Sequence, residues 1–374
     1  MLKNFKINFN ILHGSSSLKE LPKILDNYNF KQIILICDKK IMNLNYIKRN
    51  TNFIKKKFYL SFNEEPTYQQ LDQEIVKIKK IKKIDCIIAL GGGSTIDFAK
   101  AIAILLRNKG KSLKFMGFPK NLKNVIPVIA VPTTVSTGSE IIYNAVFTDK
   151  ISNIKLGINY EKNYPILSVL DSKLISRAPK KIIYQSAIAS LMRSIETYTS
   201  PDSDEITRFF SKRAYSLISS ALKNKKNKNF YRDLQWGCVF SMIALSNSSS
   251  GPSGVINYYL STNYKIAQPF SYSFTALEFI KHNIKNRYYG YCGLIDDNKI
   301  KDRMKAQIFL KDLIKTQKLL SVEIIKTKNK IKKKDDVIEE ILSIFQTKKF
   351  IPLKKNPIKI KKNQLKNILN KIIN

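Results

Sequence analysis

Three consecutive glycines and a serine, Gly91–Ser94, form the part of this sequence best suited to bind a phosphate group. They follow Cys86–Leu90, an apolar run with the composition of a strand buried on both faces. A helical apolar stripe begins at Ile96, and the Ser94 hydroxyl can cap that helix. A glycine turn between a strand and a helix N-terminus presents backbone N–H groups to an anion. Taken alone, such a run can also serve only to close a loop.

A second segment, rich in hydroxyl groups, follows another short apolar strand pattern. The strand ends at Pro132, and Thr133–Ser139 contains only one residue, Val135, that is not serine, threonine or glycine. Parallel strands place their carboxyl ends at one edge of a sheet, and ligands bind beyond that edge. We therefore expect Gly91–Ser94 and Thr133–Ser139 to lie side by side and to bind one polyanionic ligand.

These segments resemble the iron-containing alcohol dehydrogenase family, which is related to the dehydroquinate synthases. The family motifs GGGSxxDxAK, PTTxGTGSE and AVxTD correspond to Gly91–Lys100, Pro132–Glu140 and Ala145–Asp149. Ser194–Ser200 (SIETYTS) matches the AIExYxS of the family, and the resemblance extends over most of the chain. Ser194–Ala214 is most similar to the phosphonoacetaldehyde-reductase-like branch.

The resemblance implies a complete site for a nicotinamide dinucleotide. Gly91, Gly92, Gly93 and Ser94 would hold the pyrophosphate, and Asp97 belongs to the same motif. The residues expected on the nicotinamide side are Thr133, Thr134, Thr137 and Ser139. Asn144 and Lys155 match family positions near the ribose and phosphates, whereas Glu65 stands where the family usually has Asn.

The position of Asp38 indicates which dinucleotide is bound. It follows the apolar run Gln32–Cys37, which predicts the second strand of the sheet. A carboxylate at this place accepts a hydrogen bond from the ribose 2′-hydroxyl and repels a 2′-phosphate. We therefore expect NAD rather than NADP.

The metal site that the resemblance implies lacks its ligands in this chain. The family binds a divalent metal through one Asp and three His, but this sequence has only two histidines, His13 and His282. The matching positions carry Ala189, Arg193, a residue near Gly254, and Phe270. Both histidines are interpreted as structural, and we expect no catalytic metal. A metal bound elsewhere by Asp, Glu or Cys is the remaining alternative.

Arg193 is the replacement that carries a charge. It can be a surface arginine, or one paired with Glu196 three residues further along the helix. It can also act as the catalytic electrophile, because a guanidinium polarises a carbonyl or binds a phosphate or carboxylate in a bidentate manner. It would be a weaker electrophile than a metal ion.

The chain is strongly basic, with 66 Lys and Arg against 28 Asp and Glu and a formal net charge of +38. The lysines are spread along the chain, and no nucleic-acid motif accompanies them, so we expect a solvated surface and no specific nucleic acid. The charge should attract anionic substrates.

The four cysteines show no paired spacing and are expected to be buried thiols. No membrane span or signal segment is predicted, which favours the cytoplasm.

Apolar patterns predict an α/β fold followed by helices. Strands and helices alternate up to Asp171, starting with a strand at Phe5–Phe9, which indicates a Rossmann-like, doubly wound parallel sheet. Helical spacing dominates afterwards, for example in Glu205–Asn224. The predicted domains are therefore residues 1–171, which bind the dinucleotide, and an all-helical domain of residues 172–374.

Together these features favour an NAD(H)-dependent oxidoreductase without a metal. Its expected substrate is a small or sugar-like alcohol, aldehyde or ketone, with anionic substrates included. One alternative is a nucleotide-binding pseudoenzyme or assembly subunit, and another is a non-redox lyase of the synthase type. We expect a homo-oligomer, in the form of a dimer.

Overall fold

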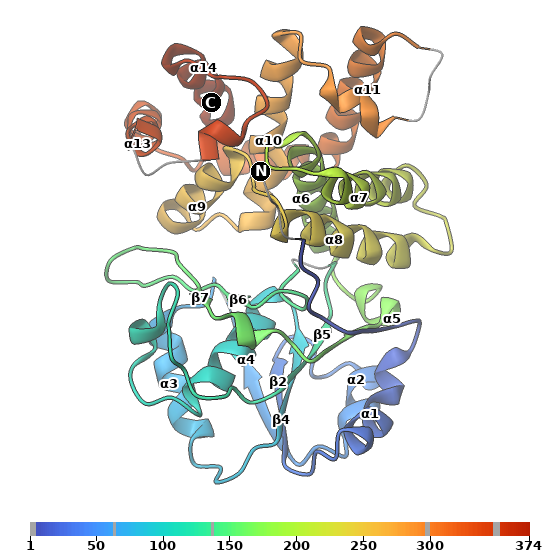
Figure 1. Cartoon of the computed structure of the whole chain (residues 1–374), viewed down its shortest axis with the longest axis vertical. Helices are drawn as coiled ribbons and strands as arrows, with labels where there is room; N and C mark the ends of the chain where they lie inside the picture. Colours follow the sequence, from blue (N-terminus) through green and yellow to red (C-terminus); the bar gives the residue numbers. More distant parts are fainter. Residues whose placement is uncertain (1–4, 63–64, 136–137, 296–299, 347–351) are drawn as a thin grey trace. The chain divides into compact units, whose positions relative to one another are not determined.

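The computed structural model describes residues 5–62, 65–135, 138–295, 300–346 and 352–374. They form two compact units, one from Ile7 to Pro179 and one that combines Lys180–Asn374 with the chain up to Lys6. The first is an α/β unit and the second is helical (Figure 1). The division falls after Pro179 and not after Asp171, because helix α5 (Ser172–Ile175) packs Leu174 into the core of the α/β unit.

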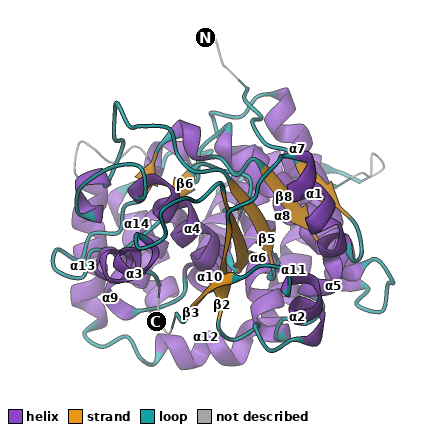
Figure 2. Cartoon of the chain, turned by 90° about the horizontal axis from the view of Figure 1, so that it is seen from below, coloured by secondary structure: helices purple, strands orange, loops and turns teal. Residues whose placement is uncertain are grey.

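The α/β unit is built on a six-stranded sheet in which every pair of neighbouring strands is parallel. Its spatial order is β1-β8-β5-β4-β2-β3, with strands visible in orange in Figure 2. The bounds are β1 Ile11–His13, β2 Ile33–Asp38, β3 Lys56–Leu60, β4 Cys86–Gly91, β5 Val128–Pro132 and β8 Leu167–Leu170. The predicted doubly wound parallel sheet is confirmed.

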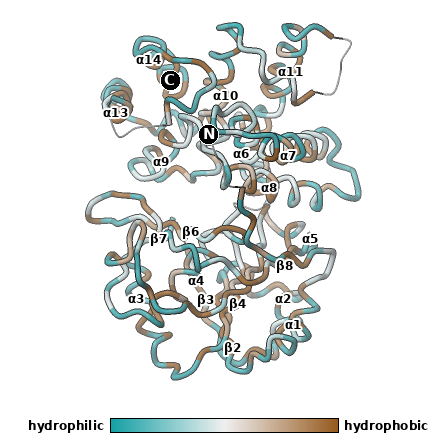
Figure 3. The backbone as a smooth tube through the Cα atoms, in the orientation of Figure 1, coloured by the Kyte–Doolittle hydropathy of each residue, from teal (hydrophilic) through white to brown (hydrophobic). Residues whose placement is uncertain are grey.

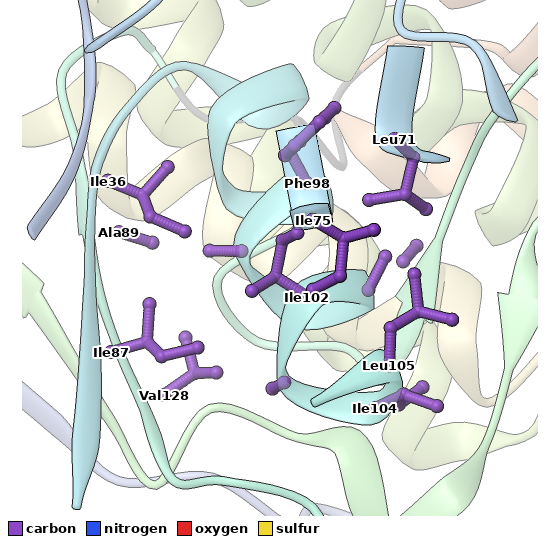
Figure 4. Packing of buried hydrophobic residues seen from close by; sticks show 14 of the residues in the cluster. Ile36, Leu71, Ile75, Ile87, Ala89, Phe98, Ile102, Ile104, Leu105 and Val128 are labelled. Atoms are coloured by element: carbon purple, nitrogen blue, oxygen red, sulfur yellow. The ribbon is translucent and has the colours of Figure 1, made fainter. Parts of the chain in front are cut away.

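Helices cover both faces of this sheet (Figure 1). One core contains residues of α1 (Leu21–Asn27) and α2 (Asn45–Thr51), and the other those of α3 (Tyr68–Ile78) and α4 (Gly93–Leu105). The uniformly apolar β4 serves both cores, since Ile88 and Leu90 belong to the first and Ile87 and Ala89 to the second. Figure 4 shows the second core, in which Ile87, Ala89 and Val128 of the strands lie near Phe98 and Ile102 of α4.

The prediction of a strand at Phe5–Phe9 is wrong. Strand β1 starts at Ile11, where the chain begins to pair with β8, and comprises Ile11–His13 only. Phe5 instead stacks on Phe210 with 5.9 Å between ring centroids. The Lys6 N–H donates to Asn247 Oδ1 at 2.6 Å. The start of the chain therefore contributes to the helical unit.

Short elements complete the α/β unit. An antiparallel pair joins β6 (Asn144–Ala145) to β7 (Ile158–Asn159). The 3-10 helices of this unit are η1 Ser17–Glu20, η2 Ser112–Phe115 and η3 Glu161–Asn163. In Figure 3 the apolar colouring follows the strands β4 and β8, in agreement with their burial.

The described residues of the helical unit form helices and no strand. Its α-helices are α6 Lys180–Thr199, α7 Glu205–Lys223, α8 Phe230–Ser246, α9 Ser253–Tyr264, α10 Gln268–Lys285, α11 Asp302–Gln317, α12 Ser321–Lys328, α13 Lys334–Gln346 and α14 Lys362–Ile373. Its 3-10 helices are η4 Gly290–Leu294, η5 Lys318–Leu320 and η6 Pro352–Lys355. Helix α6 lies at the centre and packs against α7, α8 and α10. Within the described part of the chain, no helix combines the length and apolar character needed to cross a bilayer.

Candidate cofactor and active site

The glycine turn joins β4 directly to the N-terminus of α4. The helix starts at Gly93 with Gly92 as its N-cap, so Ser94 lies inside the first turn and the prediction that it caps the helix is wrong. The Gly92 carbonyl accepts from the Thr95 N–H at 3.0 Å and from the Ile96 N–H at 3.2 Å. The first N–H groups of any α-helix have no acceptor within the helix, which leaves them available to an anion.

The two glycines at the start of this turn have different steric roles. A Cβ on Gly91 would lie 2.4 Å from Thr95 Oγ1, so no side chain fits there. A Cβ on Gly92 would have no atom closer than 3.6 Å, and the nearest atoms belong to Thr134. Gly91 is therefore needed for packing between strand and helix, whereas the space at Gly92 is open. Together with the helix N-terminus, this open space fits a pyrophosphate.

The hydroxyl-rich segment lies beside the glycine turn, as the sequence predicted. Strands β4 and β5 are neighbours with Gly91 opposite Pro132, and the Thr133 N–H donates to the Gly91 carbonyl at 2.9 Å. Thr133 and Ser139 are buried, and Thr134 is half-buried. Thr137 lies outside the described residues. The juxtaposition follows from strand order, because neighbouring parallel strands end at the same edge.

Asp97 and Lys100 connect α4 to the chain that follows β5. The Lys100 ammonium is fully buried, lies 3.0 Å from Asp97 Oδ1, and donates to the carbonyls of Ser139, Ile142 and Asn144. Burial lowers the pKa of Lys100, and the charge of Asp97 opposes that change. The other Asp97 oxygen accepts from the Val146 N–H at 3.1 Å. These contacts give Asp97 a structural role, and its direct contact with a cofactor stays a prediction.

Lys155 is paired with Glu65, a contact that the sequence did not predict. The Lys155 side chain is 4% exposed, and its ammonium forms an ion pair with the Glu65 carboxylate. Burial lowers the pKa of Lys155 and Glu65 opposes this. The acidic residue at the position where the family usually has Asn thus compensates the lysine charge. Asn144 lies nearby on β6 and donates to Asn159 Oδ1 at 2.6 Å.

Asp38 lies at the edge of the sheet where the glycine turn also lies. It is the last residue of β2, and its preceding residue Cys37 pairs with Leu90 of β4. The Asp38 carboxylate is half-buried and accepts from the Lys40 N–H at 2.8 Å. This bond orients the side chain and leaves its second oxygen for a ligand, so the geometry suits the predicted contact with a ribose hydroxyl.

Arg193 in the helical unit is half-buried, and no carboxylate of the described residues forms an ion pair with it. Its guanidinium carbon lies 5.8 Å from the ring centroid of Tyr272 on α10. Its Nη1 atom is buried and lacks a hydrogen-bond partner among the described residues. The alternative in which Glu196 pairs with Arg193 does not describe the contacts found, since Glu196 accepts from Tyr272 and from Ser253. Tyr272 and Ser253 belong to no sequence motif, so the sequence could not identify them as partners of Glu196.

The donor set does not fit the metal site of the resembled family. Ala189 is 1% exposed and Phe270 is 5% exposed, so two of the matching positions are filled by buried apolar side chains. The two histidines lie in different units, His13 on β1 and His282 on α10. Among the described residues, no group of three or more His, Cys, Asp or Glu side chains could hold a metal ion.

Comparison with known proteins identifies the α/β unit. Residues 9–172 match the model of the family described as iron-containing alcohol dehydrogenase. The α/β unit of this chain belongs to the iron-containing alcohol dehydrogenase family. "Alcohol dehydrogenase 4" of Schizosaccharomyces pombe is 27% identical over 64% of this chain and 59% of its own length. "NAD-dependent methanol dehydrogenase" of Bacillus methanolicus is 24% identical over 71% and 72%, respectively.

Solved structures extend the fold assignment to the whole chain. Sulfoacetaldehyde reductase from Bifidobacterium kashiwanohense, solved in complex with NAD+, superposes with a TM-score of 0.83. The match covers 100% of this chain and 99% of that one at 18% identity. An alcohol dehydrogenase from Oenococcus oeni gives a TM-score of 0.84 at 21% identity, over 99% and 100%. At these identities the likeness shows the fold, which is that of iron-containing alcohol dehydrogenases in both units.

Proposed function

We propose that this protein is an NAD(H)-dependent oxidoreductase that interconverts an alcohol with an aldehyde or ketone. The observation that carries the proposal is the bond from the Thr133 N–H to the Gly91 carbonyl, which joins the hydroxyl segment to an open glycine turn at a helix N-terminus. The similar proteins support it, since one is an NAD-dependent methanol dehydrogenase and the structure of another was solved in complex with NAD+.

The residues of the α/β unit have distinct roles in this proposal. Gly92, Gly93 and Ser94 bind the pyrophosphate through the N-terminus of α4. Asp38 accepts from the ribose 2′-hydroxyl and selects against a 2′-phosphate. Thr133, Thr134 and Ser139 line the nicotinamide side. Asn144 and Lys155 lie near the ribose and phosphates of the dinucleotide. The ion pair with Glu65 compensates the charge of Lys155 and makes it a weaker phosphate ligand.

Arg193 has the electrophilic role in the helical unit. Bound NADH supplies the hydride, and negative charge then grows on the carbonyl oxygen. The Nη1 atom of Arg193 is buried and has no partner among the described residues, so the proposal requires the substrate oxygen to reach the space beside this donor. A guanidinium carries N–H donors only and has no acceptor atom. Arg193 therefore polarises the oxygen, and the alkoxide that hydride transfer would leave takes its proton from water.

The proposed substrate is small, and anionic carbonyl compounds belong to the proposed class. Arginine binds carboxylate, phosphonate or sulfonate groups through paired N–H donors. The net charge of +38 favours the approach of such anions. A relative 24% identical over 71% of this chain is named sulfoacetaldehyde reductase of Bilophila wadsworthia, which agrees with this class.

A pseudoenzyme that binds the nucleotide without catalysis is the second candidate. It is favoured by the buried apolar residues Ala189 and Phe270 at two metal positions. Titration calorimetry with NADH and NADPH tests the common part of both proposals, and we expect NADH to bind more tightly. Absence of binding by both ligands contradicts both proposals, whereas preference for NADPH contradicts only the role of Asp38.

A panel of carbonyl substrates separates the enzyme from the pseudoenzyme. NADH oxidation is followed at saturating NADH with short aldehydes, keto acids, and sulfonated or phosphonated aldehydes. We expect turnover with at least one member. Tight NADH binding with no turnover across the whole panel favours the pseudoenzyme.

A further inference from the structure

Side chains of three helices form a series of contacts that ends at Arg193. The guanidinium of Arg193 on α6 lies over the Tyr272 ring on α10. The Tyr272 hydroxyl donates to Glu196, which is also on α6. The other Glu196 oxygen accepts from Ser253 Oγ at 2.5 Å, at the start of α9. Ser253 on α9 is thus connected to Arg193 through Glu196 and Tyr272.

Within this series of contacts, the Glu196 carboxylate is held in place by several hydrogen bonds. Its side chain is buried, and the backbone N–H groups of Gly251 and Ser253 donate to it in addition to the two hydroxyls. A Cβ on Gly251 would lie 2.6 Å from Glu196 Oε1, so the backbone approaches the carboxylate as closely as only glycine allows. Burial raises the pKa of Glu196, while these donors oppose the change. A carboxylate at a helix N-terminus is also favoured by the helix dipole.

Tyr272 contacts both Glu196 and Arg193. The ring is 4% exposed, and its hydroxyl is held by Glu196. Burial and the Glu196 charge raise the pKa of Tyr272 well above its ordinary value, so the hydroxyl keeps its proton and continues to donate. The face of an aromatic ring attracts a cation. The location of the ring therefore defines where the guanidinium rests.

Tyr272 also changes the partner that Arg193 would otherwise have. Side chains three residues apart on a helix are neighbours, so Glu196 would be the natural partner of Arg193. Glu196 is instead saturated by donors from Tyr272, Ser253 and the backbone. The Arg193 Nη1 atom is buried without a partner in the described chain.

We propose that Tyr272 is a positioning residue for Arg193 and that Glu196, held at the N-terminus of α9, fixes Tyr272. The catalytic consequence rests on the function proposed above for Arg193, whereas the positioning itself does not. Tyr272 keeps the guanidinium in one orientation and prevents its neutralisation by Glu196.

The positioning is tested without any substrate. The side-chain ¹⁵N signals of Arg193, assigned by their loss in Arg193→Lys, are compared in the parent and in Tyr272→Leu. We expect restricted guanidinium motion in the parent and averaged signals in Tyr272→Leu. Tyr259→Leu is the matched control, because Tyr259 is a buried tyrosine of the same unit that donates to a different carboxylate, Glu340. Unchanged Arg193 signals in Tyr272→Leu overturn the proposal.

A second variant covers the case in which Tyr272→Leu does not fold. Tyr272→Phe keeps the ring and removes the hydroxyl, which frees Glu196 to pair with Arg193. We expect the Arg193 signals of Tyr272→Phe to shift toward those of a carboxylate-paired guanidinium. Signals identical to those of the parent contradict the role of Glu196 in the proposal.

Kinetics of a double-mutant cycle test the catalytic consequence. With NADH and the best carbonyl substrate of the panel, Tyr272→Leu should lower kcat roughly 10- to 100-fold at unchanged KM for NADH. In an Arg193→Ala background it should lower kcat no further, because the two residues act as one unit. An equal loss in both backgrounds contradicts positioning. If Arg193→Ala alone turns over normally, the function proposed for Arg193 fails, and the ¹⁵N signals still decide the positioning.

Discussion

At the scale of single residues, Gly91 and Gly92 are adjacent and have opposite constraints. Gly91 faces the Thr95 side chain at distances that exclude any Cβ. Gly92 has φ −77° and ψ −176°, which any residue can adopt, and an added Cβ meets nothing closer than 3.6 Å. The folded protein therefore needs the first glycine, whereas only a bound phosphate needs the second.

This difference predicts opposite outcomes for two alanine substitutions. Gly92→Ala should leave the free energy of unfolding within about 1 kcal/mol of the parent. It should weaken NADH binding at least about tenfold, or 1.4 kcal/mol, since the methyl group occupies the phosphate position. Gly91→Ala should destabilise by about 1–3 kcal/mol through overpacking. Urea unfolding and calorimetry measure both effects, and full NADH affinity in Gly92→Ala would contradict the assigned site.

Arg193 supplies the second prediction at this scale. Loss of one donor to a developing oxyanion costs about 2.7–4 kcal/mol, or ~10²–10³ in rate. Arg193→Ala should therefore lower kcat by that order and leave the NADH dissociation constant unchanged. Arg193→Lys should recover little activity, because the planar pair of donors is lost. Steady-state kinetics measure kcat, and calorimetry measures the NADH dissociation constant. Normal turnover of Arg193→Ala would show that Arg193 is not the catalytic electrophile.

At the scale of elements, the start of α9 depends on a close approach between backbone and carboxylate. Gly251→Ala places a Cβ 2.6 Å from Glu196 Oε1 and 2.9 Å from its Cδ. Because Glu196 is locked by several donors, the carboxylate has no free direction in which to move. We expect a loss of about 1–3 kcal/mol in the free energy of unfolding.

A glycine three residues further along the chain serves as the control. A Cβ on Gly254 would meet the Ser250 hydroxyl oxygen at 2.9 Å, and a serine hydroxyl can rotate away. Gly254 lies within α9, where alanine is favoured over glycine by up to about 1 kcal/mol. Gly254→Ala should therefore be neutral or stabilising. Equal destabilisation of both variants in urea would show that the Glu196 contact is not the cause.

Asp149 links the stability of one turn to pH. Hydrogen bonds from the Ser152 hydroxyl and the Gln69 amide lower the pKa of Asp149 from 3.8 to about 2. A carboxylate whose pKa is lower in the folded state stabilises the protein above the unfolded value of 3.8. This contribution is lost as the pH falls from about 4 to about 2.

The corresponding experiment compares acid unfolding of two variants. Asp149→Asn removes the titrating group, so its melting temperature should fall less steeply than that of the parent between pH 4 and pH 2. Asp26→Asn, at an exposed position of α1, is the control and should keep the slope of the parent. A parent slope retained in Asp149→Asn would mean that other carboxylates dominate the acid response.

At the scale of the whole molecule, the chain combines a family cofactor fold with a different charge arrangement in the helical unit. The resembled family places a divalent metal and one Asp there, with a net charge of +1. This chain places Ala189 and Arg193 at two of the positions, which also gives +1. The electrostatic role can thus be kept while the coordination chemistry is given up.

This arrangement predicts the metal content of the purified protein. Elemental analysis of protein prepared without chelator should find less than stoichiometric zinc, iron and manganese. If no metal is bound, treatment with a chelator should leave the melting temperature and any turnover unchanged, because metal binding would otherwise contribute to folding. A stoichiometric metal that the chelator removes with loss of stability would show that ligands other than His form a site.

Local sequence determined the elements that carry the cofactor site. The uniformly apolar run Cys86–Leu90 predicted a strand buried on both faces, and Gly91–Ser94 predicted the turn before a helix. The sequence also predicted that the glycine turn lies beside the segment that starts at Thr133, because parallel strands joined by one helix end at the same edge of the sheet. These features depend on short-range periodicity and on a general rule of sheet topology, so the sequence contains them directly.

Tertiary structure alone decided the partners of the buried charges. Glu65 and Lys155 are 90 residues apart, and Glu196 and Tyr272 are 76 apart, so no local pattern relates them. Packing brings each pair together, and burial then makes each charge or hydroxyl depend on its partner. Tertiary contacts also decided the position of Phe5, which stacks on Phe210 of the helical unit and does not join the sheet. Residue type determines what chemistry a side chain can perform, and the fold determines which other groups it meets.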